Sequence, residues 1–471
     1  MKVLLTGATG YIGKRLLLEL IRKGHHVVCC VRDKNRFNPP EAVQENLQVL
    51  EIDFLNPSAI STIPNNIDAA YYLMHSMSAD ANYEELELKV ASNFMRLIEN
   101  TGIKQVIYLS GIVNESGLSK HLSSRKAVEN KLSEGKYYLT TLRAGIIIGS
   151  GSASFEIIRD LVEKLPVMIT PKWLNTKCQP IGIKDVIDIL SKSLGEDKLY
   201  GQSLDIGGPD VLSYKQMLLQ YAQVRRLKRY IFTVPVMTPR LSSYWLYFVT
   251  STSYKLATAL VSSMKVEVVC RDNRINQILS IQPKSYQECL RKTFMKIEDH
   301  EIVSSWKDAL TSGVLTHHLS DFMNVPSFGC FTDQRSSLIS NRENTKDRIW
   351  QIGGETGWYH ATWLWQLRGF IDKIFGGVGL RRGRTHPDQL ATGDAVDFWR
   401  VLLADKNKGR LLLFAEMKLP GEAWLEFKFV GDELVQTATF RPKGIWGRLY
   451  WYMVYPFHGV VFNGMLKKLS K

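Results

Sequence analysis

The chain has 471 residues, which is too long for one compact domain, so two or three domains are expected. Hydrophobic residues make up 45% and charged residues 23% of the sequence. These fractions exclude a disordered or fibrous chain. The net charge of +14 is spread along the sequence, whereas a nucleic-acid-binding protein usually concentrates its basic residues. We therefore expect no nucleic-acid partner. A weak attraction to anionic membranes is left open.

The cysteine spacing and the apolar stretches indicate the cellular compartment of the protein. The six cysteines form no CxxC pair, so they are expected as reduced thiols. No HExxH motif or acidic cluster predicts a metal site. The most apolar stretches, 241–262 and 445–465, are interrupted by charged residues or proline, so neither is predicted to span a membrane. We expect a cytoplasmic protein, with peripheral membrane contact and the oligomeric state left open.

Apolar runs alternate with helical patterns through the N-terminal half. Residues 2–6 lead into a glycine turn, a helical pattern and a second apolar run at 27–31, which together form a βαβ unit. Further runs are predicted as strands at 47–52, 69–74, 105–110 and 138–142, with helical patterns at 83–100 and 122–134. This order predicts an α/β Rossmann-type fold, with a doubly wound parallel sheet over residues 1 to about 215. A helical cap is expected over about 213–300.

The turn at 7–13 reads GATGYIG and lies between the first strand and the first helix. Gly7 allows a tight turn, Gly10 lets the backbone approach a pyrophosphate, and Gly13 lets helix and strand pack closely. The N-terminus of the helix adds N–H donors. The pattern predicts dinucleotide binding, and the alternative is a tight turn without a ligand. The predicted contact residues are Gly7, Thr9, Gly10, Tyr11, Ile12 and Gly13.

The end of the second strand selects the nucleotide. Arg32 is placed to pair with a 2′-phosphate, which favours NADP over NAD. Asp33 follows and would instead meet the ribose hydroxyls, and a solvated surface position is the alternative for Arg32. Asp53, after the third strand, is predicted to accept from the adenine amino group or to cap the local backbone.

These segments resemble the atypical short-chain dehydrogenase/reductase superfamily, which includes NAD(P)H-binding epimerase-like proteins and an accessory subunit of respiratory complex I. The resemblance rests on TGATGYIG at 6–13, Arg32, Asp53, YLSGI at 108–112 and QPIGIKDV at 179–186, and it covers about residues 1–300. Residues 143–173 look like a bacterial subgroup that is fused to an uncharacterised C-terminal domain. The resemblance implies hydride transfer with NAD(P)H.

The catalytic pattern of this superfamily is only partly present. Ser110 matches the usual serine, but no YxxxK motif follows it. The best register places His121 and Arg125 where tyrosine and lysine would stand. Either these residues replace the usual pair in a working reductase, or catalysis is lost and the domain senses or holds NADP(H). A helix-start residue without a special role is the alternative for His121. His75, after the fourth strand, is predicted as a cofactor-side or structural residue. Arg143, after the sixth strand, begins a loop that is predicted on the cofactor side, and an ordinary Gly/Ser turn is the alternative for this loop.

The pattern of predicted elements changes after a linker at 301–324, from alternating strands and helices to pairs of strands. Hairpins are predicted at 396–417 and 423–440, the latter with one buried face, and a long helical segment at 444–469. We interpret 325–471 as an α+β helix-grip domain that resembles START and polyketide-cyclase proteins. Such folds enclose an apolar cavity, which predicts a lipid, quinone or isoprenoid-like ligand. The alternative is that the aromatics only fill the core. Arg381, Arg382 and Arg384 with His386 either grip an anionic head group or form a solvated loop.

The first hypothesis is an NADP(H)-dependent oxidoreductase that acts on a hydrophobic carbonyl, enone or quinone-like substrate. The second is a non-catalytic NADP(H)-binding sensor or scaffold with a lipid-binding C-terminal domain. A third is a lipid carrier in which the Rossmann domain is structural.

Overall fold

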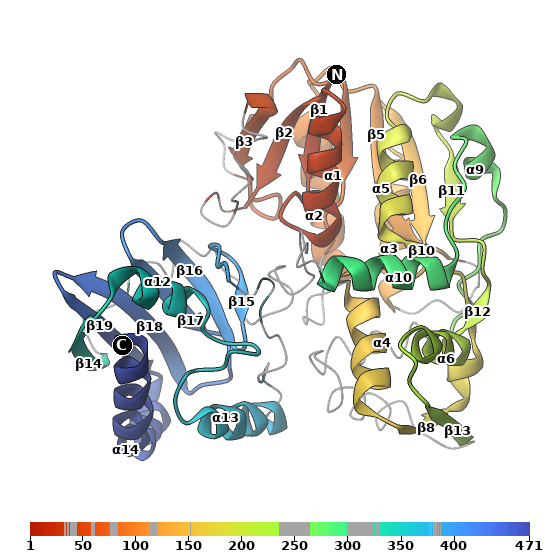
Figure 1. Cartoon of the computed structure of the whole chain (residues 1–471). Coiled ribbons are helices and arrows are strands. Elements are labelled where there is room, and N and C mark those ends of the chain that lie inside the picture. Colours follow the sequence, from red (N-terminus) through yellow and green to blue (C-terminus); the bar gives the residue numbers. More distant parts are fainter. Residues whose placement is uncertain are drawn as a thin grey trace. The chain divides into compact units, whose positions relative to one another are not determined.

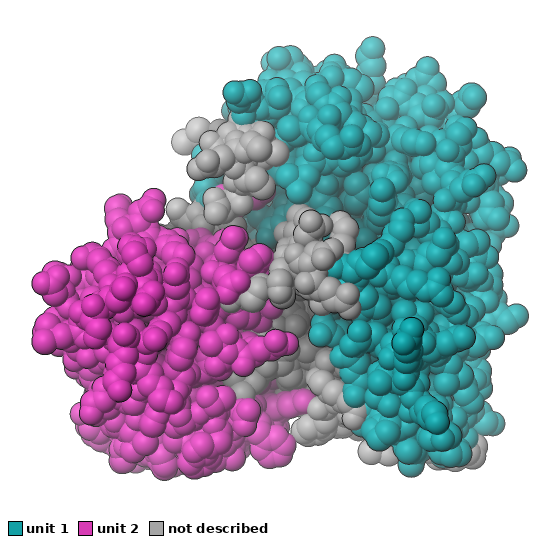
Figure 2. Space-filling model, in the orientation of Figure 1, with its two compact units in different colours: residues 1–34, 39–306 teal, residues 35–38, 307–471 magenta. Residues whose placement is uncertain are grey.

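The computed structural model describes residues 1–32, 34, 37, 45–57, 62–75, 83–113, 120–150, 152–234, 264–298, 325, 330–375, 377, 379, 384, 386 and 388–471. A few side chains inside helices, including that of His121, are not part of the description. The chain forms two compact units, which Figure 2 distinguishes by colour. The first contains Met1–Lys34 and Pro39–Trp306, and the second contains Asn35–Asn38 and Lys307–Lys471.

A seven-stranded sheet forms the centre of the first unit (Figure 1). All its pairings are parallel, in the order β11-β6-β5-β4-β1-β2-β3. The strands are β1 (Lys2–Thr6), β2 (His26–Val31), β3 (Leu47–Glu51), β4 (Ala69–Tyr72), β5 (Gln105–Gly111), β6 (Tyr138–Ala144) and β11 (Ser203–Ile206). The six predicted strands and the doubly wound parallel sheet are confirmed, and β11 is a seventh strand that the sequence did not predict. The strand order reverses between β1 and β4, the point where such sheets bind ligands.

Helices cover both faces of this sheet. α1 (Tyr11–Arg22) packs against α5 (Ile183–Lys192), and α2 (Tyr83–Ile98) packs against α3 (Lys120–Leu132). Adjacent residues of β4 face opposite layers: the hydroxyl of Tyr71 donates to the Leu190 carbonyl of α5 at 2.8 Å, and the ring of Tyr72 meets Phe94 of α2 at 5.0 Å. Because both faces are buried, the central strands are apolar on both sides, as the sequence predicted.

The cap is assembled from two separate stretches of the chain. α6 (Tyr214–Val224), β13 (Tyr230–Val234), α9 (Arg274–Ile278) and α10 (Tyr286–Glu298) lie in the predicted segment. However, α4 (Ala153–Lys164) and β8 (Val167–Pro171) also belong to it, since α4 packs on α6 and β8 pairs with β13. The rings of Phe155, Tyr221 and Phe294 join these helices. The predicted cap residues 235–263 lie outside the described part of the chain.

Short elements connect the sheet with the cap. They are β7 (Ile147–Ile148), β9 (Lys177–Cys178), β10 (Ile181–Gly182) and β12 (Leu212–Ser213), with short 3₁₀ turns at Lys172–Asn175 and Asp197–Leu199. β7 pairs with β10, and β9 pairs with β12.

The second unit contains a six-stranded antiparallel sheet, in the order β14-β19-β18-β17-β16-β15. Its strands are β14 (Phe331–Leu338), β15 (Ala395–Val396), β16 (Trp399–Asp405), β17 (Arg410–Ala415), β18 (Gly421–Val430) and β19 (Glu433–Pro442). Both predicted hairpins are therefore confirmed. Its helices are α12 (Arg342–Trp350), α13 (Thr362–Ile374) and α14 (Gly444–Leu469), and α14 matches the predicted long helix.

One face of the antiparallel sheet packs against the three helices. Leu411, Leu413 and Leu425 belong to a core cluster that includes side chains of all three. On the opposite face, Trp424 is also buried and meets Phe414 edge to face at 5.4 Å. The expected single buried face of the second hairpin is met at most positions, since Leu425, Phe427 and Leu434 are buried and Lys428 is exposed. Trp424 is an exception.

Across the part of the chain that the structure describes, no helix combines the length and the apolar character needed to cross a bilayer.

A buried ion pair generates the first prediction. Arg400 and Glu416 have no exposed side-chain surface, and Nε and Nη2 of Arg400 donate to the two carboxylate oxygens at 3.0 and 3.2 Å. Glu416→Gln leaves a buried guanidinium without its counter-charge, so we expect the free energy of unfolding to fall by about 3–5 kcal/mol. Urea unfolding followed by tryptophan fluorescence measures this loss, since nine of the eleven tryptophans lie at or after Trp306.

The matched control is Glu426→Gln, which breaks the more exposed pair with Arg410 at 2.7 Å. We expect that variant to lose less than about 1 kcal/mol. Equal losses in the two variants would contradict the account.

Candidate functional site

The glycine turn joins β1 to α1 at the point where the strand order reverses. Gly7 has a φ of +70°, and a Cβ there would lie 2.6 Å from the Leu73 carbonyl oxygen. A Cβ on Gly13 would collide with the Gly7 carbonyl. Gly10 precedes α1 as its N-cap and contributes no capping side chain. The first turn of α1 therefore presents backbone N–H groups and a partial positive charge, as a pyrophosphate requires.

The other predicted contact residues of this turn follow the same path. Thr9 is half-buried between the first two glycines, and Ile12 is half-buried in the first turn of α1. The Tyr11 hydroxyl lies beside the backbone of Gly149, and burial raises the pKa of Tyr11 to about 12. Arg15 stacks on the Tyr11 ring at 4.2 Å and donates to the Ser150 carbonyl at 3.0 Å. These contacts bring the loop after β6 to the start of α1.

Arg32 and Asp53 follow the neighbouring strands β2 and β3. The Arg32 side chain is exposed and lies close enough to Asp53 for their charges to attract. The Asp53 carboxylate accepts from the Leu55 N–H at 3.0 Å. The backbone-capping role that the sequence left open for Asp53 is thus present. Asp33 lies outside the described residues.

Ser110 and Arg125 come together beside the end of β5. Ser110 is buried, and its hydroxyl lies beside the Tyr108 hydroxyl. Nη1 of Arg125 donates to the Leu109 carbonyl at 3.4 Å, and the Tyr108 hydroxyl donates to the Arg125 carbonyl at 3.3 Å. Burial raises the pKa of Tyr108 to about 12, against the opposing effects of Arg125 and Ser110. His121 begins the same helix, but its side chain lies outside the description.

His75 is held by a buried carboxylate. Its Nδ1 lies 2.7 Å from Oε1 of Glu87 on α2, and the Ser124 hydroxyl of α3 donates to the other oxygen. Burial, with a smaller effect from Arg125, lowers the pKa of His75. At neutral pH the ring is therefore neutral, and its Nδ1–H donates to the carboxylate.

Arg143 is engaged by a second buried carboxylate. Its Nε and Nη2 donate to Glu129 of α3 at 3.1 and 2.5 Å. Ser203 and Lys126 also donate to Glu129, at 3.0 and 3.2 Å. The guanidinium that the sequence predicted on the cofactor side thus joins β6 to α3. Its contact with a cofactor stays a prediction.

Sequence reasoning missed Glu87 and Glu129. Both lie in helices among other charged residues, and nothing in the local pattern marks them as buried. A buried carboxylate needs a hydrogen-bond donor from a neighbouring element, and this requirement is the signal that could have identified both residues. Only the fold shows which donor lies near each of them.

A cavity of about 800 Å³ lies within the second unit, between the antiparallel sheet and the helices α13 and α14. Most of its lining is aromatic or aliphatic. Its lining residues are Leu364, Trp365, Leu367, Arg368, Ile371, Asp372, Phe375, Trp399, Met417, Lys418, Leu419, Pro420, Ala423, Trp424, Ala438, Thr439, Phe440, Tyr450, Trp451, Met453, Val454, Phe457, His458, Val461 and Phe462. Burial lowers the pKa of His458.

Arg384 has a structural role in the same unit. Its guanidinium donates to the carbonyls of Trp350, Ile352 and His386 at 2.6 to 2.7 Å. These bonds oppose the interpretation of Arg384 as a grip for an anionic head group, since its donors are used by the backbone.

Two family models match this chain. Residues 7–146 match a family described as NAD(P)H-binding. Residues 330–465 match DUF2867, a family of unknown function.

Curated relatives match part of this chain. A chloroplast divinyl chlorophyllide a 8-vinyl-reductase of Arabidopsis thaliana is 23% identical over 44% of this chain and 54% of its own length. The photosystem II assembly factor Ycf39 of Synechocystis is 25% identical over 23% of this chain and 33% of its own length. The chain thus spans about half the length, or less, of these relatives.

Among solved structures, a nucleoside-diphosphate-sugar epimerase of Staphylococcus aureus superposes with a TM-score of 0.49 and 14% identity, over 62% of this chain and 100% of that chain. The family match and the geometry of the glycine turn agree. Residues 7–146 of the first unit, which contain this turn, are thus similar to NAD(P)H-binding domains.

Proposed function

We propose that the protein is an NADP(H)-dependent oxidoreductase of the atypical short-chain dehydrogenase/reductase class, which reduces a hydrophobic carbonyl, enone or quinone-like substrate. The observation that carries the proposal is the glycine turn at the strand-order reversal, where any Cβ on Gly7 or Gly13 would fill space that the backbone uses. The reductases among the curated relatives support the oxidoreductase class.

NADP is favoured because Arg32 is an exposed cation at the end of β2, the position that meets the ribose of a bound dinucleotide. A guanidinium pairs with a phosphate through two parallel hydrogen bonds. Asp53 caps its own loop and leaves the Arg32 charge at the edge of the site.

The nicotinamide supplies a hydride when NADPH is bound. Ser110 then donates to the oxygen that gains negative charge, and His121 supplies the proton. Arg125 lies on α3, and its guanidinium donates to the Leu109 carbonyl of β5. It places a positive charge beside the substrate oxygen or the ribose. Because a guanidinium keeps its proton at working pH, Arg125 orients groups rather than transferring protons.

The second unit receives the hydrophobic substrate in its cavity. The long helix α14 over an antiparallel sheet is the arrangement of the helix-grip, START-like domains that we propose it resembles. A cavity of about 800 Å³ has the size of known small-molecule sites.

Replacing Arg32 tests the cofactor assignment. Arg32→Ala removes charge-assisted hydrogen bonds to the 2′-phosphate, which contribute about 1.5–3 kcal/mol. We expect the Kd for NADPH to rise about tenfold to a hundredfold and the Kd for NADH to stay unchanged. Titration calorimetry measures both.

The control is Arg22→Ala, which removes an exposed arginine in the last turn of α1 that pairs with Glu19. It should leave both constants unchanged. An Arg32→Ala protein that still prefers NADPH would contradict the assignment.

Replacing Ser110 or His121 tests the reaction. With NADPH and a decyl-substituted benzoquinone, we expect Ser110→Ala and His121→Ala to lower kcat by about 10²-fold, with the Kd for NADPH unchanged. The loss of NADPH absorbance measures turnover. Ser133→Ala, whose hydroxyl donates to the Asn130 carbonyl at the end of α3, is the control with full activity.

Full activity in the Ser110 and His121 variants would contradict the mechanism. Tight NADPH binding without turnover of the quinone or of a matched enone would contradict the reductase and favour the non-catalytic sensor, as the absent YxxxK motif would then imply.

A further inference from the structure

Two indoles in the wall of the cavity lack hydrogen-bond acceptors. Trp365 on α13 and Trp399 on β16 are 8% and 5% exposed, and both line the cavity. Neither indole N–H has an acceptor among the described residues. A buried donor without an acceptor is costly, so native structures rarely keep one unless a ligand or water completes it.

A third indole provides the contrast. Trp358 stacks on Trp365 with ring centroids 4.7 Å apart and lies 6.1 Å from Trp399. It is not part of the cavity wall, and its Nε1 donates to Asp397 at 2.9 Å. Within this aromatic group, the donor away from the cavity is satisfied and the two cavity-lining donors are not.

Two charged groups in the wall, Asp372 and Arg368, are engaged by the protein. The Asp372 carboxylate accepts from the backbone N–H groups of Gly379 and Lys418 at 2.8 and 2.7 Å. Arg368 donates to the Lys418 carbonyl at 3.5 Å and lies over the Tyr450 ring. The two indoles are buried donors in this wall without acceptors among the described residues, and an uncharged N–H donor suits a neutral oxygen.

We propose that the cavity binds an elongated apolar molecule with a carbonyl-type oxygen, which accepts hydrogen bonds from the indole N–H groups of Trp365 and Trp399. The identification of this molecule as the substrate rests on the proposed function, whereas its binding in the cavity does not. The site itself does not need the dinucleotide.

Binding of a matched pair of probes tests this site in the full-length protein without NADPH. Methyl nonyl ketone and undecane have chains of the same length, and only the ketone has an acceptor. Both displace a fluorescent anilinonaphthalene dye from the cavity. We expect the ketone to bind about tenfold more tightly, and Trp365→Phe or Trp399→Phe to weaken the ketone about fivefold to tenfold with undecane unchanged.

Trp358→Phe is the matched control, since it removes an indole N–H that already has an acceptor. It should lower stability and leave the preference for the ketone intact. Equal affinities for the two probes, or unchanged ketone binding in both cavity variants, would overturn the proposal. Undecane binding reports whether each variant keeps its fold. A failed NADPH assay leaves this result untouched.

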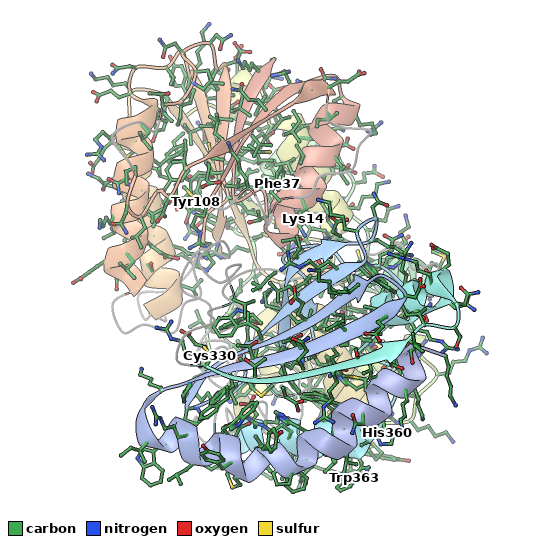
Figure 3. The ribbon with its side chains drawn as sticks, turned by 90° about the vertical axis from the view of Figure 1, so that its left-hand side faces the viewer. Lys14, Phe37, Tyr108, Cys330, His360 and Trp363 are labelled. Carbon is green, nitrogen blue, oxygen red and sulfur yellow. The ribbon has the colours of Figure 1, made fainter. Side chains whose placement is uncertain are left out.

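A separate observation concerns the outer side of the same helices. α13 and the first half of α14 expose large apolar side chains, with Trp363 63% and Trp446 78% exposed. Figure 3 shows Trp363 on the α14 side of the unit. We name this surface the α13–α14 face. Its largest members are Trp363, Phe370, Phe375, Ile445, Trp446 and Tyr452.

The charges of this face have one sign. Residues 444–469 contain no aspartate or glutamate. The one acidic residue of α13 is Asp372, which is buried. Lys443 and Arg448 are exposed at the start of α14, and Lys418 is exposed at the rim of the cavity. Aromatic side chains with basic neighbours are typical of surfaces that rest on anionic bilayers.

We infer that the α13–α14 face docks on an anionic lipid bilayer. Leu367, Phe375 and Met453 are exposed on this face and also line the cavity. The apolar lining thus continues from the docking face into the cavity, so an apolar ligand passes between the bilayer and its site without crossing water.

Vesicle flotation of the full-length protein tests the docking. We expect the protein to float with phosphatidylglycerol-containing vesicles and less with pure phosphatidylcholine, and to be released partly by high salt. Trp446→Glu combined with Phe370→Glu should weaken flotation about tenfold or more, since each places a negative charge in the interface.

Leu338→Glu is the control, because Leu338 is 71% exposed on β14 and lies outside the face. It should float like the unmodified protein. No flotation of the unmodified protein, or equal flotation of the double variant, would overturn the docking. A dimer in solution that the double variant abolishes would also overturn it, in favour of a second copy of the chain.

Discussion

The close approach of α1 to β1 at the glycine turn is the constraint on which the first unit depends. The Gly13 backbone packs against the Gly7 carbonyl, and Gly7 itself lies against the Leu73 carbonyl just after β4. The glycine turn therefore brings β1, α1 and β4 into close contact at the place where the strand order reverses. Any side chain there would separate them. The N-terminus of α1 consequently lies at the same edge of the sheet as the ends of β4 and β5.

Two buried carboxylates bind polar side chains near this edge of the sheet and so limit which of them are free to contact a ligand. Glu87 joins α2 to His75 and α3, and Glu129 joins α3 to β6 through Arg143. Burying a carboxylate is costly unless donors surround it, and each of these has at least two. His75 and Arg143 are thereby committed to the scaffold. Ser110 bonds to neither carboxylate, and its contact with a substrate oxygen stays a prediction.

Much of this arrangement could be predicted from the sequence. Uninterrupted apolar runs such as 105–110 are typical of buried parallel strands, and the alternation at 423–440 is typical of a hairpin, because both patterns follow from local geometry. The glycine spacing located the nucleotide turn for the same reason. In contrast, the pairing of β8 with β13 and of Arg143 with Glu129 depends on segments far apart in the chain. No local pattern carries that information, so α4 was not assigned to the cap and the pairing of Arg143 with Glu129 was not predicted.

In the second unit, the two halves of α14 differ in burial. Buried positions of α14 are concentrated toward its C-terminal end, at Val461, Phe462, Met465 and Leu466, which belong to the core under the sheet. Its N-terminal half is just as apolar but largely exposed. A helix that is apolar all round is normally enclosed on every side, because exposed apolar surface costs about 25 cal/mol for each Å² in water. The small number of charged residues on the exposed side, of which Arg448 is one, is therefore not a requirement of the fold. A polar outer face would give the same packing at lower cost, so the composition of this half of α14 reflects what it contacts outside the unit.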